Sequence, residues 1–201
     1  MLKLRDWIDI NKLNWVTLSG NPNAIDLLIE NQDKINWNWL SENPNAMELL
    51  KENQDEINWK YLSKNPNALI LLNENKDKID WEYLSKNPNA IKLLKENKDK
   101  IDWEFLSENP NAMKLLKENK NKINWNYLSK NVNIFTFIKD TNIFKLRNWI
   151  DSNKIHYDIL SENINAESLL KQPNKIYRID WCRLSKNPNA IEILNRNQNF
   201  I

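Results

Sequence analysis

An aromatic residue recurs at a fixed interval through most of this chain. Six tryptophans are evenly spaced, and the series continues with a tyrosine after a longer gap and then a further tryptophan: Trp15, Trp37, Trp59, Trp81, Trp103, Trp125, Tyr157 and Trp181. The even spacing of about 22 residues falls within the range of periods that is typical of solenoids and other repeat arrays. The sequence therefore predicts eight stacked units, and "DWEYLSKNPNAIKLLKENKDKI" (80–101) is a representative one.

Each predicted unit contains two helix starts. The residue before the aromatic is Asn or Asp in seven units and His in one, and Asn and Asp readily accept hydrogen bonds from the free N–H groups that begin a helix. A second helix is predicted to start at Asn87, because Pro88 then occupies the first helical position, where its missing N–H costs nothing. Ala90 and Leu94 fall on one face of that helix. We expect the unit to end at Asn97, since asparagine tolerates the left-handed conformation that closes many helices.

These features predict an all-α fold: an α-solenoid of eight short two-helix repeats of about 22 residues each, with an interrupting leading helix. The alternative is a strand–helix solenoid like that of leucine-rich repeats, because Ile79, Trp81 and Tyr83 alternate with acidic residues. In that fold Glu82 would take the first leucine position of the motif, and Asp and Asn are unfavourable within strands. The sequence therefore favours the all-helical solenoid over this alternative.

The tryptophans are expected to form the core that neighbouring units share. A single unit of this length buries too little apolar surface to offset the conformational entropy lost when its chain is ordered. Stacking on neighbours supplies the missing burial in repeat proteins. The large aromatic side chain of each unit is the natural candidate for that shared contact.

The repeat pattern divides the chain into four segments. The sequence "LKLRDWIDINKL" (2–13) matches "FKLRNWIDSNKI" (144–155), and each is predicted to form a helix that leads into an array. The predicted organisation is a leading helix or cap at 1–13, six units at 14–142, a second leading helix at 143–156 and two units at 157–201. Residues 131–142 align with the second helix of a unit, although Val132 stands in place of proline. We expect the solenoid to change direction near 139–156.

The C-terminal end of the solenoid is expected to bind a partner or a second copy of the chain. Ile201 holds the same phase as Ile101, so the sequence stops just before another aromatic helix would begin. Solenoids usually end in a unit with a polar outer face, and the sequence has no such unit here. We therefore expect an apolar end face that a partner or a second copy could cover.

Three residue types that build many active sites are scarce. The chain has one Cys (Cys182), one His (His156) and one Gly (Gly20), which excludes a disulfide within the chain, a zinc site made of Cys and His, and a glycine-rich phosphate loop. His156 occupies a helix-capping position, and Cys182 takes a position that is polar in most units. We therefore predict a protein that is not an enzyme, with no catalytic residue, no metal site and no cofactor.

Charge and hydropathy limit the partners and the compartment. The net charge is +2, from 29 basic and 27 acidic residues, so no overall field attracts nucleic acid or a membrane surface. The first ten residues carry charges and do not resemble a signal peptide, and the longest apolar run, at 134–138, is too short to span a membrane. These features predict a cytoplasmic or otherwise intracellular protein that makes no membrane contact.

A second aromatic row is the candidate binding site. Its members lie two positions after the repeating aromatic of five units: Trp39, Tyr61, Tyr83, Phe105 and Tyr127. Together with the repeating aromatic and the leucine that follows, they span about 160° of the helix, which is wide for one buried face. Packing in the core is one interpretation of this row. The other is a partly exposed row that contacts a protein or stacks on bases.

The phrase "LSxNPNAIxLLxxNxDKIxW", present as Leu84 to Trp103, resembles the Asn- and Trp-rich tandem repeats of uncharacterised proteins of large DNA viruses of amoebae and algae. The resemblance is good over about 14–130 and 180–199 and poor over 131–179. It implies a viral origin, in a host cell or virion, and no activity that can be assigned to particular residues.

The predicted function is a non-enzymatic repeat scaffold that binds an unidentified protein. The alternative is sequence-tolerant binding of single-stranded nucleic acid, which some helical repeats perform. Lys64 and Lys86 share one surface position of the repeat, but Glu42 and Glu108 fill the same position in other units. A track for a nucleic-acid backbone would need one sign of charge, so the sequence disfavours this alternative.

The paired asparagines of each unit raise a separate question. Both remain where the intervening proline is lost, as at Asn131 with Asn133 and at Asn163 with Asn165. The second asparagine is therefore expected to do more than accompany proline. We expect it to tie its turn to the neighbouring unit, with water or a ligand as the other partners that its amide could bind.

Overall fold

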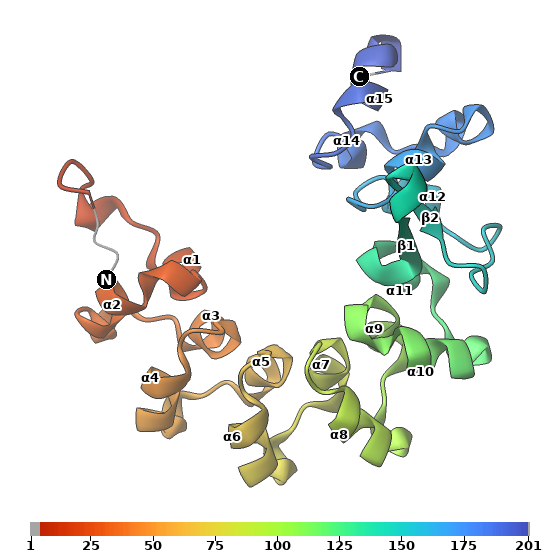
Figure 1. The fold of residues 1–201 in the computed structure, drawn as a ribbon. Helices are drawn as coiled ribbons and strands as arrows, with labels where there is room; N and C mark the ends of the chain where they lie inside the picture. The colour runs from red at the N-terminus through yellow and green to blue at the C-terminus, as the bar shows by residue number, and fades with distance from the viewer. Residues whose placement is uncertain (1–4, 201) are drawn as a thin grey trace. The chain divides into compact units, whose positions relative to one another are not determined.

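Short helices that pack serially against their neighbours, as in a helical repeat solenoid, make up most of the protein (Figure 1). The computed structural model describes residues 5–200. Two compact units divide the chain, Met1–Ile101 and Asp102–Ile201, and each is described here by itself. The division falls within the stretch that the sequence assigns to the first array, rather than at 143–156.

The first compact unit contains two rows of helices. One row begins at the repeating tryptophans: α1 (Trp15–Ser19), α3 (Trp37–Glu42), α5 (Trp59–Lys64) and α7 (Trp81–Lys86). The other row comprises α2 (Ile25–Ile29), α4 (Met47–Glu52), α6 (Leu69–Glu74) and α8 (Ile91–Glu96). Helices α1, α3, α5 and α7 pack against one another in sequence order, and Figure 1 shows them as the inner row of this unit.

The second compact unit continues the same alternation with one exception. Its tryptophan- or tyrosine-led helices are α9 (Trp103–Glu108), α11 (Trp125–Lys130), α12 (Tyr157–Leu160) and α14 (Trp181–Leu184). Helices α10 (Met113–Glu118), α13 (Glu167–Leu170) and α15 (Ile191–Arg196) follow α9, α12 and α14. A two-stranded antiparallel sheet of β1 (Phe135–Ile138) and β2 (Ile143–Leu146) follows α11.

The first helix start of each unit is confirmed. Asp80 precedes α7 in extended conformation, and its Oδ1 accepts a hydrogen bond from the Tyr83 N–H at 2.9 Å. Asn36 and Asn58 cap α3 and α5 in the same way. The strand–helix alternative is wrong, because Trp81 to Tyr83 form the first turn of a helix instead of a strand.

The second helix start is confirmed in two units and shifted in others. Asn21 and Asn109 cap 3-10 turns that begin at a proline and lead directly into α2 and α10. Helix α8 instead begins at Ile91, and Asn87 Oδ1 accepts a hydrogen bond from the Asn89 N–H at 2.9 Å in the turn before it. Helix α8 ends at Glu96 with Asn97 as its C-cap, as predicted, but the φ of Asn97 is −129° and not left-handed. Its side-chain amide donates to the Leu93 carbonyl at 2.9 Å, which satisfies one of the free carbonyls at the helix end.

Leucine, alanine and isoleucine form the core, and this corrects the expectation for the tryptophans. Leu62, Leu72 and Ala68 are fully buried in one repeat of the first compact unit. The residues at the same positions of other repeats, such as Leu84 and Leu106, are also buried. The repeating tryptophans are only partly buried, because each stands at the first position of its helix, at the edge of the packed interior. Tyr157 is the exception and is 1% exposed.

A cation from the following turn covers most of these rings. The Nζ of Lys78 lies 4.5 Å from the ring centre of Trp59, and that of Lys100 lies 4.7 Å from Trp81. The same contact recurs in other units: Lys34 on Trp15, Lys122 on Trp103 and Lys154 on Trp125. Such cation–π contacts contribute about 0.5–1 kcal/mol each at exposed sites. In the regular units each contact joins the tryptophan to the turn that ends its own unit.

The second helix predicted within 131–142 is wrong. A 3-10 turn at Val132–Ile134 leads into β1, and Lys139–Asn142 connect β1 to β2. The two strands are rich in aromatic and β-branched residues, which favour an extended over a helical backbone. Asn142 adopts a left-handed conformation with φ of 52°, which a hairpin loop of this length accommodates.

Both predicted leading helices are wrong over the described residues. Of 1–13, residues 1–4 lie outside the described part of the chain; the remainder forms a turn and a 3-10 helix at Ile10–Lys12. Of 143–156, the first four residues form β2 and the rest form turns. The two segments nevertheless adopt the same turn: Asp9 accepts from the Asn11 N–H at 3.0 Å, and Asp151 from the Asn153 N–H at 2.9 Å. These local bonds compete with helix formation.

Candidate functional site

The predicted aromatic row lies on the helices led by tryptophan. Trp39, Tyr61 and Tyr83 project from α3, α5 and α7 in the first compact unit, and Phe105 and Tyr127 from α9 and α11 in the second. Trp39 is 48% exposed, whereas the other four are half-buried. The structure therefore places the five residues in two stretches that are neither core nor fully exposed.

The rings within each stretch pack edge to face. The ring centres of Tyr61 and Tyr83 are 5.8 Å apart at an interplanar angle of 77°. Phe105 and Tyr127 are 5.5 Å apart at 89°. Edge-to-face packing fixes ring orientation, so each stretch presents a partly ordered aromatic surface.

Gly20 makes room for the largest ring of the row. It occupies the repeat position that Glu42 and Lys64 hold in the next two units. A methyl group added at Gly20 would lie 3.2 Å from Cε3 of Trp39, closer than ordinary van der Waals contact. The chain's one glycine therefore allows the one tryptophan of the row to approach the preceding turn.

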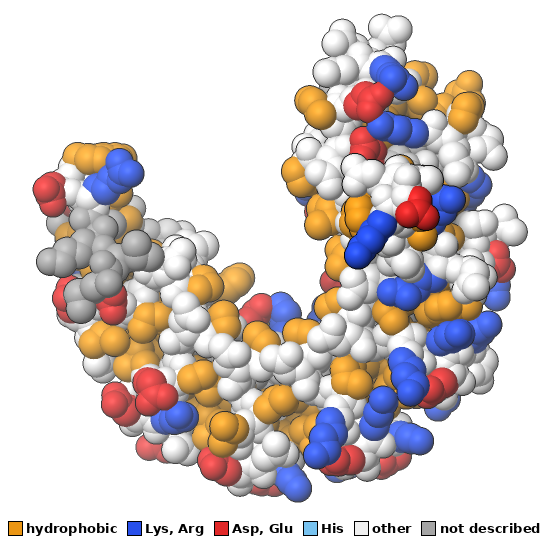
Figure 2. Space-filling view, viewed as in Figure 1, with side chains coloured by type: hydrophobic (Ala, Val, Ile, Leu, Met, Phe, Trp, Pro, Cys, Tyr) orange, Lys and Arg blue, Asp and Glu red, His pale blue; other side chains and the backbone are white. Residues whose placement is uncertain are grey.

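Charges of both signs surround the aromatic row. Glu42 and Lys64 form an ion pair beside Tyr61, and the Nζ of Lys60 lies 4.6 Å from the ring centre of Tyr83. The pKa of Tyr127 is raised above its ordinary value, first because its hydroxyl hydrogen bonds to the Glu104 carboxylate and then because of burial. Acidic and basic side chains are likewise mixed over α4, whereas basic ones gather over α10 (Figure 2).

The row changes character after Tyr127. The equivalent positions of α12 and α14 hold Ile159 and Arg183, and Arg183 pairs with Glu162 at 3.5 Å. Beside them a hollow of about 350 Å³ is lined by Ile159, Glu162, Arg183 and Lys130, among others. Sequence reasoning missed this part of the surface, because the signal it used was aromatic residues at this position.

The paired asparagines hold successive units together. The side-chain amide of Asn65 is buried and donates to the carbonyls of Ser41 at 3.1 Å and Asn43 at 2.8 Å in the preceding unit. Asn67, the second of the pair, donates to the Pro44 carbonyl at 2.8 Å. The equivalent bonds of the second asparagine recur at Asn45, Asn89, Asn133, Asn165 and Asn189. The prediction that it ties its turn to the neighbouring unit is confirmed, and the inter-unit bonds of the first asparagine were missed.

A buried serine adds a further bond between units. Ser63 Oγ donates to the Trp59 carbonyl at 2.8 Å and accepts from the Asp80 N–H at 3.0 Å, at the start of the next unit. Because Ser and Asn contacts satisfy these backbone groups, the abundance of asparagine has a structural explanation.

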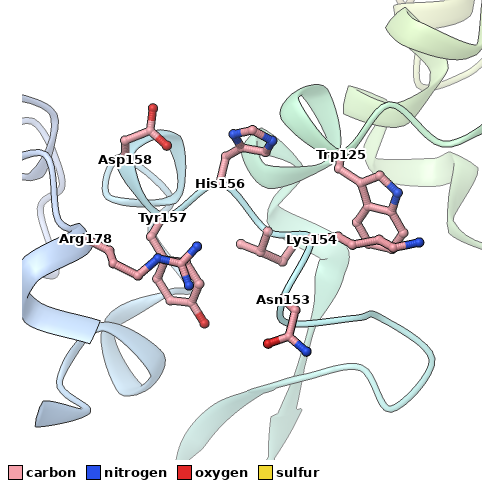
Figure 3. Close-up of a pocket in the computed structure, with 8 residues that line it drawn as sticks. Trp125, Asn153, Lys154, His156, Tyr157, Asp158 and Arg178 are labelled. Atoms are coloured by element: carbon pink, nitrogen blue, oxygen red, sulfur yellow. The ribbon is translucent and has the colours of Figure 1, made fainter. Parts of the chain in front are cut away.

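His156 lies in a hollow of about 370 Å³ between α11 and α12 (Figure 3). Arg178 lies 4.2 Å from the ring centre of Tyr157, and Lys154 lies 5.3 Å from that of Trp125. The His156 side chain does not cap α12; its backbone N–H donates to Ser129 Oγ at 3.0 Å. The described residues that line this hollow include Tyr157, Asp158 and Arg178, and no serine, threonine or cysteine is among them.

The lone cysteine, possible metal ligands and helix lengths complete the description of residues 5–200. Cys182 is exposed, and no group of three or more His, Cys, Asp or Glu side chains within residues 5–200 could hold a metal ion. In the same part of the chain, no helix has the length and apolar character needed to cross a membrane. No protein-family model, curated protein or solved structure matches the chain.

Proposed function

We propose that this protein is a non-enzymatic α-solenoid of eight units that binds a protein partner through the aromatic row. The observation that carries the proposal is the partial exposure of the row. Trp39 is 48% exposed, and Tyr61 and Tyr83 are less exposed but not buried. Partly buried, oriented aromatic side chains are the residues that most often dominate binding energy at protein interfaces. The proposed site residues are Trp39, Tyr61, Tyr83, Phe105 and Tyr127.

The division of labour within each unit supports this proposal. Asn65, Asn67 and Ser63 are occupied with bonds between units, and the buried leucines with the core. The positions beside the aromatic row differ between units, with Glu42 and Lys64 as examples. Such a surface sets partner choice by its pattern of charge, while the scaffold stays constant.

Mixed charge favours a protein over a nucleic acid as the partner of this row. The ion pairs Glu42–Lys64 and Arg183–Glu162 place opposite charges at its edge. A phosphate backbone needs cations without neighbouring carboxylates, because its affinity comes from neutralising phosphates. We also propose an intracellular site of action, in a host cell or virion if the origin is viral.

The proposal is tested by photo-crosslinking in cells that contain the protein. A photoreactive phenylalanine analogue is placed at Trp39 in one variant and at Ile70 in the control; Ile70 is an apolar residue of α6 that is 72% exposed. We expect defined protein adducts from position 39 and few from position 70, and fewer still at position 39 when Tyr61 is also changed to alanine. Equal labelling at both positions, or adducts at position 39 that nuclease removes, would contradict the proposal.

A further inference from the structure

A groove lies beside the hairpin. It has a volume of about 680 Å³ and lies between α10 and the face of the hairpin that carries Thr136 and Lys145, which are paired across the two strands. The free edge of β2 is covered by α13, because Ser168 of α13 donates a hydrogen bond to the Phe144 carbonyl. The groove therefore exists because a hairpin stands where other units have a helix.

The charged side chains that line the groove are all basic. They are Lys114 and Lys117 of α10, Lys145 of β2, and Arg147 directly after β2. None of the four forms an ion pair within the described part of the chain, although Arg147 Nε donates to the Asn133 carbonyl at 2.6 Å. Cations gathered without carboxylates repel one another, so an acidic partner here gains attraction and relieves repulsion.

The surrounding sequence has the same bias. Residues 110–149 hold eight basic and two acidic residues, whereas the whole chain is nearly balanced with 29 and 27. Figure 2 shows the basic side chains gathered over α10. The local field is therefore positive on a chain whose overall charge is close to neutral.

Apart from the cations, Thr136 and Asn148, the lining is apolar. Met113, Ile138, Leu146 and Trp149 contribute to it. Aliphatic side chains accept an aliphatic or aromatic side chain of a partner, whereas single-stranded nucleic acid needs aromatic faces on which successive bases stack. Trp149 is the one aromatic residue among the described residues of the lining. The lining thus favours a peptide over a nucleic acid.

We propose that this groove binds an acidic peptide segment of a partner protein, with one large apolar side chain seated among carboxylates. The carboxylates pair with the four cations, and the apolar side chain displaces water from the apolar lining. This interaction is separate from the aromatic row, so it holds or fails independently of the function proposed above.

The test measures binding of a fluorescein-labelled peptide by anisotropy with the full-length protein. The probe is a ten-residue peptide of Asp and Glu with a central Leu-Phe pair; a second peptide has Ser-Ser at the centre, and oligothymidylate is the nucleic-acid comparison. The test variant is Lys114→Glu with Lys117→Glu. The matched control is Lys92→Glu with Lys95→Glu, because these residues hold the same positions on α8 and the charge change is identical.

We expect the Leu-Phe peptide to bind the unmodified protein, with at least roughly tenfold weaker binding to the α10 variant and at most about a twofold change in the α8 variant. The Ser-Ser peptide should bind at least roughly tenfold more weakly than the Leu-Phe peptide. Thermal melting of both variants reports whether they fold; if the α10 variant does not, Lys145→Gln replaces it. No binding, equal loss in both variants, or tighter binding of oligothymidylate with loss in the α10 variant would overturn the proposal.

Discussion

The regular stretch from α3 to α8 and the interrupted stretch from α11 to α12 differ in the spacing of the repeating aromatic and in the presence of a second helix, and they share the hydrogen bonds between units. In the regular stretch the repeating aromatics keep an even spacing, as from Trp59 to Trp81, and a second helix follows each first helix. In the interrupted stretch Trp125 and Tyr157 lie further apart, and a hairpin and a turn replace the second helix. A unit therefore tolerates a longer spacing and the loss of its second helix.

The bonds that persist across the interruption are those of asparagine and serine. Asn163 donates to the carbonyls of Ser129 at 3.4 Å and Asn131 at 3.1 Å, as Asn65 does to Ser41 and Asn43 in the regular stretch. His156 donates its N–H to Ser129 Oγ at 3.0 Å. The extra residues leave the stack as the hairpin and turn, so the inter-unit bonds, rather than helix content, define the unit.

Removing the buried asparagine should have the largest effect. Asn65→Ala removes the side-chain donor to the Ser41 and Asn43 carbonyls and the acceptor of the Asn67 N–H, and we expect a loss of about 2–3 kcal/mol in the free energy of unfolding. Asn163→Ala should cost less, about 1–2 kcal/mol, because its bonds are longer. The measurement is urea unfolding followed by circular dichroism. Asn67→Ala is the control and should cost less than about 1 kcal/mol, since its side-chain bond is exposed. A smaller loss for Asn65→Ala than for its control would contradict the claim that the buried bonds between units stabilise the stack most.

Tyr157→Phe should stabilise the interrupted stretch. The buried hydroxyl of Tyr157 makes no hydrogen bond to any residue that the structure describes, so its removal ends a desolvation cost. We expect a gain of up to about 1 kcal/mol in the free energy of unfolding. Tyr61→Phe in the regular stretch is the control and should change it by less than about 0.5 kcal/mol. A clear loss of stability in Tyr157→Phe would show that the hydroxyl has a partner.

The smallest expected effect concerns the one repeat of the regular stretch in which glutamate stands at the position of the ring-covering lysine. Glu56 occupies the repeat position from which Lys78 and Lys100 cover the rings of Trp59 and Trp81, and the equivalent ring of its own unit is Trp37. Glu56→Lys should therefore raise the free energy of unfolding by about 0.5 kcal/mol through a new cation–π contact. Asp55→Lys is the control, with the same sign of charge change at the neighbouring exposed position. An equal gain in both variants would indicate a general effect of charge.

The sequence predicted the parts of the fold that local chemistry decides. The even period of the repeat, the helix starts at Asp80 and its equivalents, and the tie made by Asn89 all follow from residue types at fixed positions. The core residues were assigned less well. Position in the helix, rather than hydrophobicity, leaves Trp81 at the edge, and that depends on where the helix begins.

What the sequence could not supply comes from contacts between units. The buried bonds of Asn65 join residues 22 and 24 positions apart, so no local pattern points to them. The match between 2–13 and 144–155 was a real signal for a shared conformation, but that conformation is an Asx turn made by Asp9 and Asp151 and not a helix. The groove beside α10 was missed because its basic and apolar lining comes from three separate segments.

Amide hydrogen exchange tests most directly whether inter-unit bonds define the unit. The N–H of Asn124 donates to Ser107 Oγ at 3.0 Å within a regular step, and that of His156 donates to Ser129 Oγ at 3.0 Å across the interruption. We expect the two amides to exchange with protection factors within roughly tenfold of each other, and Ser129→Ala to remove protection from His156 alone. Exchange of His156 at the rate of an unprotected amide, with Asn124 still protected, would contradict this expectation.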